Sequence, residues 1–250
     1  MVFLTQGFAM NSERVTPKGP RSRGQIRLEN LRRGVYRFRR NSLSMVGLVI
    51  LLVLLIVAVI APIIVPYPED ATGATHVMER LKPPSKAHFF GTDKIGRDIF
   101  SRVLMGTGLA LQVGTTIIFL AASIGVTLGS IAGYFGRRID DLIMRITDIF
   151  LAVPALVLAI AVTAALGKGI TNVMIGISLV WWPGFARLTR SLVISLKEEA
   201  FVEAAHGIGA SHGRVLFRHI LPNAISPIIV KMSTDFGFAI LTAAALGFIG

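Results

Sequence analysis

The sequence predicts an all-α protein, a polytopic bundle of transmembrane helices. Of its 250 residues, 53% are hydrophobic and 16% are charged, which leaves too little polar surface for a water-soluble globule of this size. The apolar residues gather in long runs, and glycine and other small residues recur within these runs, as they do in packed membrane helices. There is no cysteine, so disulfides and thiolate metal sites are excluded.

The first predicted span covers residues 45–65. This run of 21 residues carries no charge, and 16 of them are Leu, Ile or Val. At 1.5 Å per residue, a helix of this length crosses a hydrocarbon core of about 30 Å. The run begins too far from the N-terminus, and is too long, for the apolar core of a cleavable signal peptide. It is therefore a membrane helix.

Four further apolar segments follow, giving five predicted spans. They cover residues 108–132, 142–166, 172–188 and 225–248. The segment 142–166 contains Pro154 and also Arg145 and Asp148, which lie three apart and can pair on one helix face. Glycines such as Gly125, Gly129 and Gly133 in the segment 108–132 would let neighbouring helices approach closely.

The distribution of basic residues predicts the orientation. Residues 1–44 hold ten Lys and Arg against two Glu, whereas residues 66–107 hold six Lys and Arg against five acids. Basic flanks stay on the cytoplasmic side, so the N-terminal segment is predicted inside and residues 66–107 outside. Residues 108–250 then form the membrane core, with a cytoplasmic connection at residues 189–222. The net charge of +12 mostly reflects basic residues on the predicted cytoplasmic side of the membrane, and no nucleic-acid partner is expected.

The N-terminal segment 1–44 has two parts. Residues 1–24 are rich in Pro, Gly, Ser, Thr and Arg, and we expect no fixed fold there. In residues 26–40, apolar residues alternate roughly with arginines, which predicts a basic amphipathic helix lying on an anionic inner membrane surface. The alternative is a solvated basic tail that only fixes the topology.

The cytoplasmic connection is predicted to contain two short helices. Ser195 and Glu198 have the spacing of a capping box, which predicts a helix start, and Gly207 and Gly209 supply the left-handed conformations of a helix end. A second short helix can begin at Ser211. It should stop before Pro222, since the residue before a proline avoids the helical region.

The spacing within this connection resembles the EAA loop of ATP-binding-cassette (ABC) importer permeases. The matching residues are Glu203, Ala204, Ala205, Gly209, Leu221 and Pro222. In that family the loop supplies a coupling helix that docks on a cytoplasmic ATPase. One departure is His219, which stands where the family pattern usually has Ile.

A second resemblance lies in the predicted outer segment. It is similar to the GTDxxGRDxxSR signature of the dipeptide, oligopeptide and nickel permease family, in the subunit with an extra N-terminal span. The matching residues are Gly91, Thr92, Asp93, Gly96, Arg97, Asp98, Ser101 and Arg102. The charged members are four to five apart, which favours intrahelical ion pairs. The alternative role is direct contact with a solute or its binding protein.

Together, residues from about 30 to the end resemble the type I transmembrane domain of an ABC importer. The resemblance implies a permease subunit in the cell membrane that works with a homologous second permease subunit, two cytoplasmic ATPases and an extracytoplasmic solute-binding protein. No GxxxxGK[ST] stretch is present, so we expect no enzyme activity and no cofactor in this chain. ATP and Mg²⁺ would bind the partner ATPases, and we predict no metal site. A sixth span is expected in the family, so we expect the sequence to be truncated.

The solute path is the least defined feature. Lys231 and Asp235 lie four apart in the last predicted span, where charges are costly, and can pair on one helix face. They are the predicted residues facing the solute, with snorkelling or helix packing as the alternative. Peptides are the first expected solute class, followed by nickel and oligosaccharides. The alternative function is a secondary transporter, or another polytopic membrane protein, without an ATPase partner.

Overall fold

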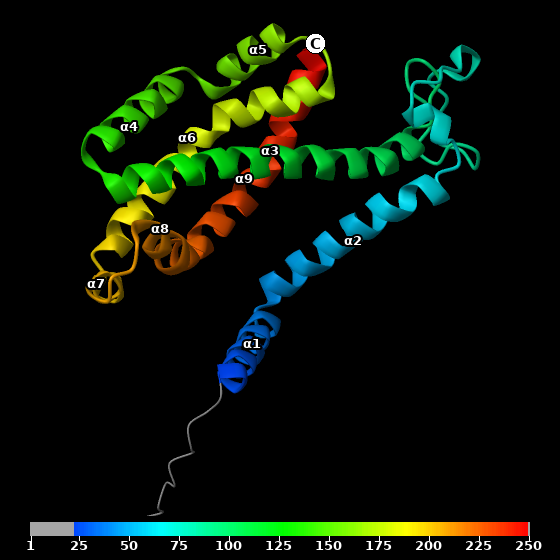
Figure 1. Cartoon of the computed structure of the whole chain (residues 1–250). Coiled ribbons are helices and arrows are strands. Elements are labelled where there is room, and N and C mark those ends of the chain that lie inside the picture. Colours follow the sequence, from blue (N-terminus) through cyan, green and yellow to red (C-terminus); the bar gives the residue numbers. More distant parts are fainter. Residues whose placement is uncertain (1–22, 250) are drawn as a thin grey trace, which may run out of the picture. The chain divides into compact units, whose positions relative to one another are not determined.

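The structure is a computed structural model that describes residues 23–249, and nearly all of this part is helical (Figure 1). An isolated bridge between Thr92 and Asp98 is the β-type pairing found in these residues. The helices, in chain order, are α1 (Arg23–Arg40), α2 (Ser42–Ile64), the 3₁₀ turns η1 (Pro68–Ala71) and η2 (Val77–Glu79), α3 (Ile99–Phe135), α4 (Arg137–Ala152), α5 (Ala155–Leu166), α6 (Ile170–Lys197), α7 (Ala200–Gly207), α8 (His212–Val215), the π turn η3 (Leu216–Ile220) and α9 (Leu221–Ile249).

The chain divides into two compact units, residues 1–54 and 55–250. The described part of the first unit holds α1 and the beginning of α2, joined at Asn41. The side-chain oxygen of Asn41 accepts a hydrogen bond from the Ser44 amide at 3.3 Å, which caps the start of α2. The lack of a fixed fold that we expect for residues 1–24 falls almost entirely outside the described residues.

The second unit is organised around α3, which has 37 residues and is about 55 Å long. It lies along α6 (Figure 1), and the shared core includes Ile117 and Ala121 of α3 with Ile177 and Phe185 of α6. Helices α5 and α9 contribute Ala159, Ala239 and Leu246 to the same core. The predicted all-α bundle of membrane helices is therefore confirmed.

Three helical stretches are long and apolar enough to cross a membrane: Ser42–Ile64, Ile99–Phe135 and His212–Phe248. The predicted span 142–166 falls on α4 and α5, which meet at an angle of 94° and would add a fourth if they count as one broken span. The break has a local cause, because Val153 adopts an extended conformation before Pro154. The predicted span 172–188 lies inside α6, which is not among these stretches, so the count of five stays a prediction.

Close packing of α3 on α6 depends on glycine. A Cβ atom placed on Gly125 would lie 2.4 Å from the Trp182 carbonyl oxygen, and one on Gly129 would lie 2.3 Å from the Ala186 carbonyl oxygen. Both distances are shorter than any real contact, and backbone atoms cannot move aside as a flexible side chain can. The small residues predicted to allow close helix approach therefore do so here.

Replacing Gly129 with alanine should destabilise the bundle by about 1 to 3 kcal/mol, because α3 and α6 must separate to admit the methyl group. The matched control is Gly237→Ala in α9, where nothing lies within 4 Å of the added atom. Thermal unfolding in detergent, followed by size-exclusion chromatography, should show a lower midpoint for Gly129→Ala only. Equal midpoints for both variants would contradict this account of the packing.

Candidate functional site

The first candidate site is an elbow formed by residues 198–216 at the end of α6. Its inner side is a small apolar core in which Val202 and Ala205 of α7 contact residues of other elements. These partners are Tyr134, Val193, Val215, Leu216 and Ile220. Because α7 packs on residues from α3, α6, α8 and η3, the elbow is a packed element with a core of its own.

The outer side of the elbow is exposed. Glu203 and Ala204 are exposed on α7, whereas Ala205, the third residue of the predicted EAA triplet, is buried. Two large apolar side chains lie beside them, Phe201 with 40% and Ile208 with 87% of its surface exposed. The exposed side of α7 therefore combines the acid Glu203 with apolar side chains.

The end of α7 has the hydrogen bonds of a Schellman motif. The amide of Gly209 donates to the His206 carbonyl at 2.9 Å, and the amide of Ala210 donates to the Ala205 carbonyl at 3.0 Å. Gly209 has a φ of +79°, in the left-handed region that favours glycine. The predicted left-handed conformation is thus present at Gly209, but the prediction is wrong for Gly207, which is still part of α7.

Two local predictions for this region are wrong. Ser195 and Glu198 do not begin the short helix, since α6 continues to Lys197 and α7 begins only after Glu199, whose side chain makes no capping hydrogen bond. The helix after Ser211 does not stop at Leu221 and Pro222 either. It continues through η3, where the Leu221 amide donates to the Leu216 carbonyl. This wider π turn rearranges the hydrogen bonds just before Pro222, so the chain runs on into α9.

Polar contacts tie the elbow to the C-terminal end of α3. The hydroxyl of Tyr134 lies 2.9 Å from Nδ1 of His212 in α8. The ammonium of Lys197 donates to the Tyr134 carbonyl at 2.8 Å and lies 5.6 Å from the centre of the Tyr134 ring. A displacement of the elbow would therefore pull directly on α3 as well as on α6.

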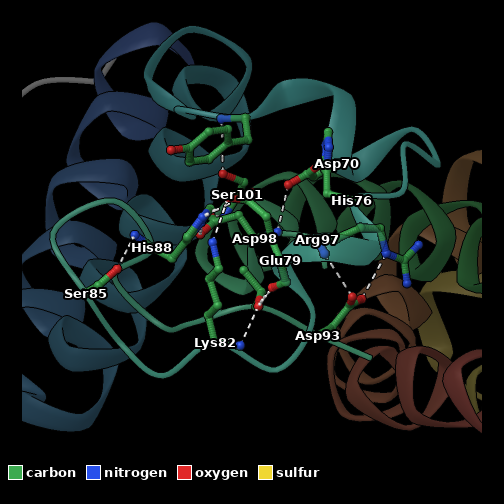
Figure 2. A network of polar contacts seen from close by, with 12 residues as sticks. Asp70, His76, Glu79, Lys82, Ser85, His88, Asp93, Arg97, Asp98 and Ser101 are labelled. Atoms are coloured by element: carbon green, nitrogen blue, oxygen red, sulfur yellow. Dashed lines mark hydrogen bonds and ion pairs between the residues drawn. The ribbon is translucent and has the colours of Figure 1, made fainter. Parts of the chain in front are cut away.

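The second candidate site is the segment of residues 66–98, which we call the cap segment because it folds onto the N-terminal end of α3 (Figure 2). Asp98 is fully buried and accepts a hydrogen bond from the Ser101 amide at 2.7 Å, so it is the N-cap of α3. Its other oxygen lies 3.0 Å from Nδ1 of His88. The Asp98 amide in turn donates to the buried carboxylate of Asp70 at 2.7 Å.

A second carboxylate holds the turn before α3. Asp93 accepts hydrogen bonds at 3.0 Å from the amides of Ile95 and Arg97, and forms ion pairs with the side chains of Arg97 at 2.9 Å and Arg102 at 2.5 Å. Residues 93–98 form a turn, not a helix, so the predicted intrahelical ion pairs are wrong. Arg97 is the expected partner of Asp93, but a loop brings the two together, and Arg102 pairs with Asp93 and not with Asp98.

The uncharged signature residues have packing roles in the cap segment. Thr92 is buried, accepts from the Lys82 amide at 2.8 Å and donates to the Glu79 carbonyl. Gly96 has a φ of +86°, and a Cβ atom there would lie 1.8 Å from the His76 carbonyl oxygen. Gly91 and Ser101 are also buried. The signature thus serves the internal structure of the cap segment, and a direct contact with solute or binding protein stays a prediction.

Three carboxylates of the cap segment, those of Asp98, Asp93 and Glu79, favour their charged forms. Burial raises the pKa of Asp98, but hydrogen bonds from Ser101 and the contact with His88 outweigh it, so the pKa lies below its usual value. Burial likewise raises the pKa of Asp93, and its bonds with Arg97 and Ile95 lower it by more. The pKa of Glu79 is lowered chiefly by its hydrogen bond and ion pair with Lys82.

A group of potential metal ligands also lies in the cap segment. Glu69, Asp70 and His76 place one ligand atom each within 4.8 Å of one another. However, one oxygen of Asp70 lies 2.9 Å from Nε2 of His76, and the other accepts from the Asp98 amide. These hydrogen bonds account for the positions of Asp70 and His76 without a metal ion.

The two candidate sites lie at opposite ends of α3. Ser101 at its beginning accepts a hydrogen bond from the Tyr67 amide of the cap segment, and Tyr134 at its end contacts the elbow (Figure 1). The intervening helix is about 55 Å long, longer than a hydrocarbon core of about 30 Å. If α3 crosses a membrane, the elbow and the cap segment face opposite compartments.

Four of the charged residues within the predicted spans form two ion pairs. Lys231 pairs with Asp235 at 2.9 Å, as predicted, and its ammonium lies 5.2 Å from the centre of the Phe185 ring on α6. Both side chains are partly buried in this chain. The predicted pair of Arg145 with Asp148 is wrong, since Asp148 contacts Arg187 of α6 at 2.6 Å.

Comparison with known proteins matches residues 125–250 to the family model of the binding-protein-dependent transport system inner membrane component. Residues 30–84 match the N-terminal transmembrane domain of oligopeptide transport permease C. The chain is 48% identical over 212 residues to the dipeptide transport system permease protein DppC of Alkalihalophilus pseudofirmus, covering 85% of this chain and 69% of the relative. It is 40% identical over 214 residues to the oligopeptide transport system permease protein OppC of Bacillus subtilis, covering 86% and 69%.

A third relative is the probable D,D-dipeptide transport system permease protein DdpC of Escherichia coli, 41% identical over 216 residues, covering 86% of this chain and 72% of the relative. The chain belongs to the family of binding-protein-dependent transport system inner membrane components, the permeases of ABC importers. It is therefore a membrane transport component and not an enzyme, and the resemblance found in the sequence is confirmed.

Proposed function

We propose that this permease imports peptides or related small solutes, and that its elbow docks on a cytoplasmic ATPase subunit that binds ATP and Mg²⁺. The relatives are named for dipeptide, D,D-dipeptide and oligopeptide transport, so peptides are the solute class best supported. The observation that carries the docking proposal is the exposed side of α7, where Glu203 and Ala204 lie beside Ile208. Small side chains there allow a close approach to a partner groove.

The proposed orientation follows the basic residues. Residues 1–44 and the elbow would lie in the cytoplasm, and the cap segment would face an extracytoplasmic solute-binding protein. Support comes from the positions of the elbow and the cap segment at opposite ends of α3. A homologous second permease subunit would complete the solute path. A second ATPase subunit would complete the pair of ATPases that drives transport.

Mechanically, the elbow is suited to act as a lever. Its small core joins α7 to residues of α3, α6 and η3, so a partner that displaces α7 would move these helices together. Such a rigid-body movement could open the path alternately to the two sides of the membrane. Lys231 and Asp235, paired on α9 next to α6, are our proposed contacts along the path.

The Glu203→Lys variant tests the docking proposal. Reversing this exposed charge should lower the amount of ATPase that copurifies with the permease by about tenfold, corresponding to about 1.4 kcal/mol. The measurement is affinity purification of the tagged permease, expressed with its partners, and quantification of the bound ATPase. A secondary transporter would bring down no ATPase at all, which distinguishes the alternative function.

The matched control for this test is Asp141→Lys, which makes the same charge change at an exposed position of α4, away from the elbow. It should retain ATPase at the wild-type level. Wild-type recovery with Glu203→Lys would show that this side of α7 does not dock.

A further inference from the structure

A separate feature of the first unit is an uncompensated arginine surface on α1. Residues 23–40 contain seven arginines and one acid, Glu29. Glu29 contacts Arg33 at 2.6 Å. Arg32, Arg39 and Arg40 line a shallow hollow of about 560 Å³ together with Val35 and Tyr36, and we call these three arginines the arginine face. Within residues 23–249, no carboxylate lies within ion-pairing distance of any of the three.

Helical geometry explains the composition of this surface. At about 100° per residue, positions seven apart differ in direction by about 20° and positions eight apart by about 80°, so Arg32, Arg39 and Arg40 lie within a sector of about 100° on one side of the helix. Val35 and Phe38 follow on the adjoining side, with 53% and 44% of their surfaces exposed. An arginine surface bordered by apolar side chains is typical of helices that lie in the interface of a membrane.

The arginine face also lies directly before a membrane span. Asn41 is the single residue between α1 and α2, and the most apolar 18-residue stretch of α2 has a mean hydropathy of 3.3. Arg40 is therefore two residues from the start of a helix that enters the bilayer. This position holds the arginines close to the level of lipid headgroups.

We propose that the arginine face binds the phosphates of anionic phospholipids in the leaflet where α2 begins, while Val35 and Phe38 insert among the lipid chains. Guanidinium groups bind phosphate oxygens in bidentate geometry, and the face has no internal carboxylate to compete. The proposal depends on α2 spanning the membrane, which belongs to the proposed function. It requires neither the cytoplasmic orientation nor transport.

A single-cysteine label can test this proposal, because the chain has no native cysteine. The full chain carrying Val35→Cys, labelled with a nitroxide, would be placed in nanodiscs of phosphatidylcholine alone or mixed with phosphatidylglycerol. Accessibility to oxygen relative to a water-soluble nickel chelate reports the depth of the label. We expect a deep label with phosphatidylglycerol and a shallow one without it, and we expect high salt to weaken the difference.

Replacing Arg32, Arg39 and Arg40 together with glutamine should abolish the effect of phosphatidylglycerol. Each arginine near an anionic surface contributes about fivefold to partitioning, so the inserted population should fall about 100-fold. Glutamine keeps a good helix propensity, and the triple lysine variant should retain most of the insertion because it keeps the charge.

The charge-matched control replaces Arg80, Lys82 and Lys86 of the cap segment with glutamine, and should insert like the wild type. A label depth that is the same with and without phosphatidylglycerol, or is unchanged in the triple glutamine variant, would overturn the proposal. An acidic partner protein would then be the better candidate for this surface. Because the readout is label depth, a failure of the ATPase docking proposal would leave it unaffected.

Discussion

Replacing Gly209 with valine should reduce ATP-dependent solute uptake to background while the chain still inserts into the membrane. Gly209 has a φ of +79°, and no other atom lies within 4 Å of an added Cβ atom, so the conflict is with the backbone alone. A β-branched residue in this conformation costs about 2 kcal/mol, enough to disfavour the observed turn roughly thirtyfold. The Schellman bonds at the end of α7 would then be lost, and with them the fixed position of its exposed side.

The control for this variant is Gly207→Val, two residues earlier. Gly207 is the last residue of α7, has a helical backbone and also has open space around it. Valine there should retain most of the uptake, since the turn after α7 is untouched. Uptake in proteoliposomes containing the complete transporter, with ATPase association measured in parallel, gives the comparison. Equal uptake by the two variants would mean that the turn at Gly209 does not transmit movement.

The elbow shows where local sequence rules fail. Ser195 and Glu198 have the spacing of a capping box, yet α6 extends through Ser195 to Lys197. Tertiary contacts account for the difference, because Val193 packs into the core of the elbow and Lys197 bonds to the Tyr134 carbonyl. Tyr134 lies 63 residues before Lys197 in the sequence, beyond the reach of a capping pattern. The turn at Gly209 could be predicted because its cause is local, the backbone freedom of one glycine.

In the cap segment, too, some features could be predicted from the sequence and others could not. The signature residues were identified from their spacing, but their partners Asp70 and His88 were missed. Asp70 lies 28 residues before the amide it accepts from, and the loops between them have no periodicity that would predict the contact. The predicted helix around Asp93 identified its partner Arg97 correctly, but the backbone there forms a turn and not a helix. Apolar runs, by contrast, predicted three stretches that are long and apolar enough to span a membrane, residues 45–65 in α2, 108–132 in α3 and 225–248 in α9, because the length of an apolar run can be read from the local sequence.

The second large effect is expected for Asp98→Ala. This change removes the N-cap of α3 and leaves the ring of buried His88 and the Ser101 amide without their acceptor. Removing one partner from a buried polar pair costs about 3 kcal/mol or more. The cap segment should therefore detach from α3, and amide hydrogen exchange across residues 66–98 should accelerate strongly at neutral pH.

Glu79→Ala is the matched control, since Glu79 is a second carboxylate of the cap segment with a lowered pKa, but its side chain is 42% exposed, pairs with Lys82 at the surface and lies no closer than 3.7 Å to the His88 ring nitrogen. Exposed pairs contribute little, so its hydrogen exchange should stay near the wild-type rate. Acid should reproduce the Asp98→Ala result in the wild type. Because the pKa of Asp98 is lowered, its stabilisation is complete above the usual value of 3.8 and is lost as the pH falls through the lowered pKa. If Asp98→Ala exchanged no faster than Glu79→Ala, the buried network would not be what holds the cap segment on α3.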